Sequence, residues 1–102
     1  MTFQIIVEAD AKQDWIEAVD WYEEREPGVG WRLNDEILSG LQTLATQPER
    51  FRLVTRLTRR LKVTKPWPYS LYFTVNAGHR EVRVLAIWHG ARSPAQLRRR
   101  LK

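Results

Sequence analysis

The sequence predicts an α+β domain in which one strand, two helices and three further strands follow one another along the chain. Two observations predict this class. Apolar residues recur at steps of three and four between residues 11 and 45, whereas residues 57–63 and 69–75 show a period of two. Because two amphipathic helices and a sheet each have an apolar side to bury, we expect the helices to pack on one face of the sheet.

The first half of the chain predicts a strand and a helical hairpin. Residues 3–7 form a short β-branched run, typical of a strand. A helix follows, with Asp10 at the position of an N-cap and apolar residues at 11, 15, 18, 19 and 22, and it ends at Pro27-Gly28. A second helix begins near Gly30 and stops at Gln47-Pro48. The short connection makes the two helices antiparallel neighbours.

The second half predicts an antiparallel meander. In residues 57–63 the alternation turns Leu57, Arg59, Leu61 and Val63 inward, with residues 60 and 62 outward. Residues 69–75 and 81–88 form a hairpin through the turn at 76–79. Residues 84–88 are apolar on both faces, which predicts a central strand. For the tail, a short basic helix and a disordered segment both remain open.

Length and composition indicate one domain spanning residues 1–102, with a basic tail at about 93–102. No stretch has the roughly 18 apolar residues of a membrane span, and the first residues lack the pattern of a signal peptide. We therefore expect a cytoplasmic protein with no membrane partner. The absence of cysteine excludes disulfides and thiolate metal sites, and with two histidines we expect neither a metal nor a cofactor.

Charge is divided between the two halves of the chain. Residues 1–49 hold 3 basic and 11 acidic residues, net −8, whereas residues 50–102 hold 14 basic residues and 1 acidic residue, net +13. Such a density of cations requires solvent or an anionic partner. The basic half allows three interpretations: a face that is only solvated, a surface that contacts nucleic-acid phosphate, and a surface that contacts an acidic protein partner.

His89 and Arg92 follow the last predicted strand, where a sheet end often presents functional groups. A histidine three residues before an arginine suits an acid or base beside a phosphate clamp, although a hydrogen-bonded capping histidine is the simpler interpretation. The other enzyme signatures are missing: there is no glycine-rich phosphate loop, no histidine pair at metal spacing and no nucleophile elbow. The carboxylates of the first helix have the pattern of a solvated or partner-facing surface: Asp14, Glu17, Asp20, Glu23 and Glu24.

Five segments, in order and spacing, resemble the RelE/ParE superfamily of toxins from bacterial type II toxin–antitoxin, or plasmid stabilisation, modules. They are Glu17 to Glu23, Pro27 to Gly30, Pro48 to Phe51, Pro68 to Phe73 and His89 to Arg92. The resemblance covers about residues 3–100. It implies a toxin that is neutralised by a cognate antitoxin in a hetero-oligomer.

The resemblance also implies two branches with different targets. RelE-like members cleave mRNA on the ribosome without a metal, and ParE-like members poison DNA gyrase. The ribonuclease branch commonly has an arginine directly after the position of Tyr69, where this chain has Ser70. The arginine that this branch has just after the last strand is retained here as Arg92. The tyrosine that the branch has near its C-terminus is missing from this chain. These departures favour the ParE-like branch, whose members are not nucleases, over the enzymatic branch.

Three hypotheses follow. The first is a gyrase inhibitor; the second is a metal-independent endoribonuclease that uses Arg60, Lys62, His89 and Arg92; the third is a non-toxic module that only binds an antitoxin or DNA. For binding an antitoxin or target, the sequence nominates basic residues throughout the second half: Arg56, Arg59, Arg60, Lys62, Arg83, Arg92, Arg98, Arg99 and Arg100.

Overall fold

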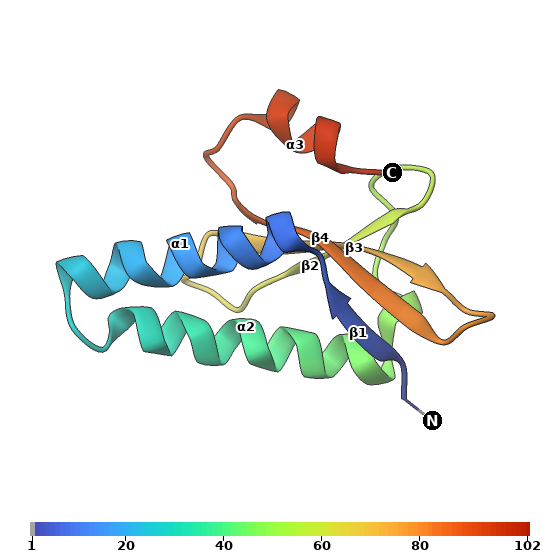
Figure 1. Cartoon of the computed structure of the whole chain (residues 1–102), viewed down its shortest axis with the longest axis horizontal. Coiled ribbons are helices and arrows are strands. Elements are labelled where there is room, and N and C mark those ends of the chain that lie inside the picture. Colours follow the sequence, from blue (N-terminus) through green and yellow to red (C-terminus); the bar gives the residue numbers. More distant parts are fainter. Residues whose placement is uncertain (1) are drawn as a thin grey trace.

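A computed structural model describes residues 2–102 of the chain (Figure 1). The elements are β1 (Gln4–Val7), α1 (Ala9–Arg25), α2 (Val29–Thr46), a 3-10 turn η1 (Pro48–Arg50), β2 (Thr58–Lys62), β3 (Tyr69–Asn76), β4 (Glu81–His89) and α3 (Pro94–Arg100). Their order and type confirm the predicted α+β class. No helix of residues 2–102 is long and apolar enough to cross a membrane.

The four strands form one mixed sheet in the order β1-β4-β3-β2. β1 pairs in parallel with β4, and β2, β3 and β4 form the predicted antiparallel meander. Helices α1 and α2 pack as a hairpin on one face of the sheet (Figure 1). Between the helices and the sheet lies the core, in which Leu33, Ile37, Leu71 and Phe73 are fully buried. Trp88 is buried, and Trp15 is partly buried.

A register shift in the β3–β4 pair decides which side chains of β4 meet the helices. Phe73 pairs with Val84, whereas the preceding Tyr72 pairs with Ala86, so Leu85 is an extra residue on β4. Val84 lies on the helix face before this bulge, and Ile87, opposite Leu71, lies on the same face after it. The bulge therefore turns residue 89 toward the helices and residue 88 toward the opposite face.

The opposite face of β4 is covered by α3, which crosses above the sheet in Figure 1. This selects the helical interpretation of the tail over the disordered one. Ser93 caps α3 by accepting a hydrogen bond from the Gln96 backbone N–H at 3.2 Å. At the chain end, the Thr58 hydroxyl donates to the Lys102 carbonyl at 2.7 Å. The tail is thus tied to β2, 44 residues earlier in the chain.

Two local predictions are wrong. Asp10 lies in the first turn of α1 and the N-cap position is Glu8, because the helix begins at Ala9, two residues before the apolar pattern. Leu57 is 55% exposed and lies before β2, which starts at the buried Thr58. The inward positions of Leu61 and Val63 are confirmed.

Candidate functional site

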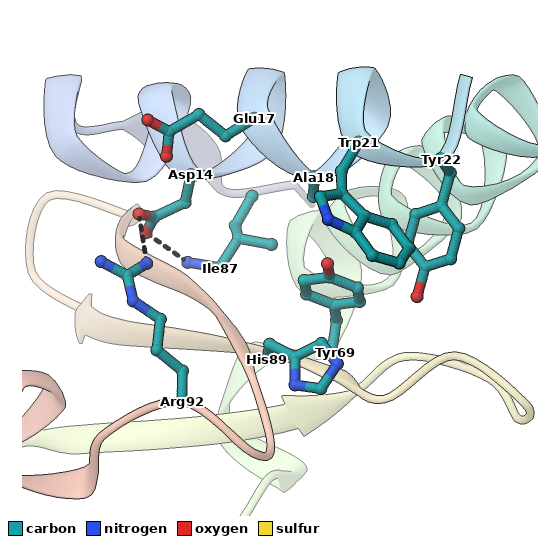
Figure 2. Close-up of a pocket in the computed structure, with 9 residues that line it drawn as sticks. All are labelled: Asp14, Glu17, Ala18, Trp21, Tyr22, Tyr69, Ile87, His89 and Arg92. Carbon is teal, nitrogen blue, oxygen red and sulfur yellow. Dashed lines mark hydrogen bonds and ion pairs between the residues drawn. The ribbon is translucent and has the colours of Figure 1, made fainter. Parts of the chain in front are cut away.

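A pocket of about 350 Å³ lies where α1 crosses the ends of β3 and β4 (Figure 2). α1 contributes Ala18 and Trp21 to its wall, and the sheet contributes Tyr69, Ile87 and His89. In Figure 2 the aromatic rings lie on one side and Arg92 on the other. The pocket therefore offers apolar walls, and its other end holds Arg92 together with the carboxylates of Asp14 and Glu17.

His89 is held as a capping residue inside this pocket. Its Nδ1 accepts a hydrogen bond from the Ala91 backbone N–H at 2.9 Å. Its ring also packs edge-on against Tyr69, with 5.2 Å between the ring centroids. Of the two interpretations of His89, these contacts match the capping one.

Tyr69 is a partly buried phenol of the site. Burial raises the pKa of Tyr69 to about 12, and the adjacent Tyr22 adds to the shift. The folded protein holds this proton more tightly than the unfolded chain does, because an unfolded tyrosine has a pKa near 10. The stability that Tyr69 contributes is therefore fully present below pH 10 and is lost as the pH rises from 10 toward 12.

We expect a Tyr69→Phe variant to lose the tyrosine that ionises near pH 12. Titration followed by phenolate absorbance should give a component near pH 12 in the parent protein that disappears in this variant. Tyr72→Phe is the control, since Tyr72 lies on the other face of the sheet and should leave that component in place. A parent protein whose phenols all ionise together near pH 10 would contradict the expectation.

At the other end of the pocket, the side chain of Asp14 on α1 forms hydrogen bonds to β4 and to α3. Its side chain is 4% exposed and accepts two hydrogen bonds of 2.9 Å from the Arg100 guanidinium. It also accepts from the Ile87 backbone N–H at 3.1 Å and lies 3.5 Å from Arg92 Nη1. The hydrogen bonds to Asp14 raise the pKa of Arg100. Asp14 is thus a buried structural anion, which corrects its predicted place on a solvated surface.

This cluster closes an edge of the sheet. β1 is short, and its pairing with β4 ends at Val84, so among residues 2–102 the following part of β4 has no neighbouring strand on that side. There the Asp14 carboxylate accepts from the Ile87 N–H, and Arg100 donates to the Leu85 carbonyl at 3.1 Å. Two side chains thereby replace strand hydrogen bonds that buried backbone groups require.

Arg92 and Arg100 also pack on Trp88, with guanidinium carbons 3.9 and 5.3 Å from its ring. These cation–π contacts place both arginines between the sheet and the tail. Within the described residues the Trp88 Nε1 is buried without a hydrogen-bond partner.

The nine nominated basic residues divide into two groups. Four are engaged within the protein. Arg59 donates to the Glu49 and Phe51 carbonyls, Arg83 pairs with Glu8 and Glu81, and Arg92 and Arg100 bind Asp14. The other five form no ion pair among residues 2–102, and most of them are exposed: Arg56, Arg60, Lys62, Arg98 and Arg99.

Comparison with known proteins supplies the family. Residues 5–94 match the family model described as the ParE toxin of the type II toxin–antitoxin system parDE. That match spans most of the chain. The protein belongs to the ParE toxin family.

Relatives of this ParE-family toxin agree in sequence and fold. It is 33% identical over 91 residues to Toxin RelE1 of Caulobacter vibrioides, covering 88% of this chain and 96% of that protein. A structure of the chromosomal ParDE system from P. aeruginosa superposes with a TM-score of 0.73 at 19% identity, covering 85% of this chain and 95% of that one. The isolated E. coli RelE toxin gives 0.54 at 17% identity, covering 95% and 94%. The resemblance to the RelE/ParE superfamily is confirmed.

The fold separates the four residues nominated for a ribonuclease. Arg60 pairs with Tyr72, and Lys62 pairs with Ser70, both on the face opposite the helices. His89 lines the pocket beneath α1 on the helix face. Arg92 lies beyond the strand end and is bound to Asp14. The toxin therefore does not bring these four side chains to one place.

Sequence reasoning missed Asp14, although a signal was available. Ala11, Asp14 and Ala18 are spaced three and four residues apart, and all three are buried on one side of α1. A carboxylate that shares the spacing of an apolar stripe is a candidate for burial with a cationic partner.

Proposed function

We propose that this type II toxin acts by inhibiting DNA gyrase, as the ParE-like interpretation of its sequence predicts. One observation favours gyrase inhibition over ribosome-dependent mRNA cleavage. The four groups nominated for metal-free cleavage lie on two faces of the sheet, and Arg92 is occupied by Asp14. General acid–base catalysis requires its groups within hydrogen-bond reach of one reacting site. The missing C-terminal tyrosine and Ser70 support the same choice.

Toxins of this class pair with a cognate antitoxin, and we propose that the free cations provide its electrostatic contacts. Arg56, Arg98 and Arg99 are exposed, and Arg60 and Lys62 add charge on the outer face of the sheet. An acidic and apolar antitoxin segment matches this basic surface, and its affinity should fall as salt rises. The cytoplasm is the proposed location, since both the antitoxin and the target are there.

Growth experiments separate the two targets. After induction of the toxin alone in a bacterial host, we expect pulse-labelling to show DNA synthesis blocked within minutes while protein synthesis continues. Purified toxin should inhibit gyrase supercoiling at micromolar concentration.

The opposite pattern would restore the ribonuclease alternative. An immediate block of translation with transcripts cut on the ribosome, and loss of that cutting in Arg60→Ala, would contradict gyrase inhibition. Normal growth under strong expression, with folded protein confirmed by circular dichroism, would instead favour a non-toxic binding module.

A further inference from the structure

The helical hairpin has a second cavity, of about 240 Å³, that the folded core does not explain. It lies between α1 and α2, and we call it the hairpin groove. Its lining residues are Lys12, Trp15, Ile16, Val19, Asp20, Trp31 and Asn34. Ile16 is 50% exposed and Trp31 is 60% exposed. Large apolar side chains gathered around an exposed groove mark an interaction surface, since their exposure contributes nothing to folding.

The groove is held in shape before any partner binds. The Trp15 indole N–H donates to the Asn34 side-chain oxygen at 2.8 Å, which links α1 to α2 across the groove. Where the helices meet, Gly30 allows their backbones a close approach. A rigid groove with an exposed tryptophan loses little conformational entropy on binding, and buried tryptophans are frequent energetic centres of protein interfaces.

Charge indicates what kind of partner fits. The hairpin, residues 9–46, contains nine acidic and three basic residues, and the charged residues that line the groove are Asp20 and Lys12. An acidic segment such as the proposed antitoxin contact is repelled here and is attracted to the basic half of the chain, which carries net +13. The groove therefore fits a basic surface that offers apolar side chains.

We infer that the hairpin groove is the surface through which the toxin docks on DNA gyrase, at a basic surface that otherwise binds DNA phosphate. The inference rests on the proposed function. An enzyme that handles duplex DNA must present cations to the phosphate backbone. The acidic hairpin is complementary to such a surface, with Trp31 and Ile16 as apolar anchors. The toxin thus binds its target through the acidic hairpin and its antitoxin through the basic half of the chain.

The test compares two pairs of exposed apolar residues. Ile16→Ser with Trp31→Ala removes the anchors of the groove, and Leu53→Ser with Leu57→Ser removes residues of similar exposure, 48% and 55%, from the basic half. We expect the groove variant to inhibit gyrase supercoiling at least about tenfold more weakly than the parent, and the control variant to change by less than about twofold. Asp20→Lys should also weaken inhibition, and a short DNA duplex should compete with the parent toxin for gyrase.

Each outcome has a distinct meaning when antitoxin binding is measured on the same variants, after circular dichroism has confirmed that they fold. A groove variant that inhibits gyrase as well as the parent overturns the inference and leaves the proposed function standing. A groove variant that loses the antitoxin but keeps its action on gyrase assigns the groove to the antitoxin and also overturns it. A parent toxin without effect on gyrase removes the proposed function and the inference together.

Discussion

Asp14→Ala should destabilise the toxin by about 3 kcal/mol, because it leaves the Ile87 N–H without its acceptor and the partly buried Arg100 without its buried counter-ion. The Asp14 side chain is 4% exposed, and its two oxygens satisfy Arg100, Arg92 and the Ile87 N–H together. A domain of this size has a total unfolding free energy of about 5–15 kcal/mol, so such a loss is a large fraction of it. Urea denaturation followed by circular dichroism measures the change.

Two further variants identify the origin of the loss. Asp14→Asn keeps an oxygen for the Ile87 N–H but removes the charge, so its destabilisation should fall between that of Asp14→Ala and zero. Asp20→Ala deletes an exposed carboxylate of the same helix and should change stability by less than about 0.5 kcal/mol. Equal effects of Asp14→Ala and Asp20→Ala would refute the role assigned to the buried ion pair.

Gly30→Ala should cost about 3 kcal/mol, because the hairpin leaves no space for a side chain there. A Cβ atom at this position would lie 2.3 Å from the Val19 carbonyl oxygen and 2.6 Å from Glu23 Cγ. The nearest of these atoms is backbone, so α1 and α2 would have to separate. Since Asn34 and Trp31 belong to α2 and Trp15 to α1, the hairpin groove would widen as well.

Gly40→Ala is the matched control within the same helix. Gly40→Ala gains up to about 1 kcal/mol of helix propensity in the helix interior, whereas Gly30 lies in the first turn of α2 and gains less there. At position 40 the nearest atoms are the ends of leucine side chains, Leu71 Cδ1 at 3.1 Å and Leu61 Cδ2 at 3.3 Å, which can shift slightly. Denaturation midpoints in urea should therefore fall much further for Gly30→Ala than for Gly40→Ala. Identical midpoints would show that the helices separate without cost.

Much of the fold follows from local patterns that can be read along the chain. The helices of the hairpin, the meander and the central position of β4 were predicted from periodicity, since side chains three or four apart share a helix face and alternate ones share a strand face. The division of charge between the two halves is likewise a property of the sequence alone. The ordered motifs were sufficient to indicate the superfamily, and the match over residues 5–94 confirms it.

Contacts between distant residues decided the rest. Asp14 and Arg100 are 86 positions apart, and only the packing of α3 across β4 makes the carboxylate a buried anion rather than a solvated one. The bulge at Leu85 reverses the alternation of β4, so that His89 lines the pocket beneath α1 while Trp88 lies against Arg92 and Arg100. Periodicity reports which residues share a face, but the identity of the neighbour on that face depends on the tertiary structure.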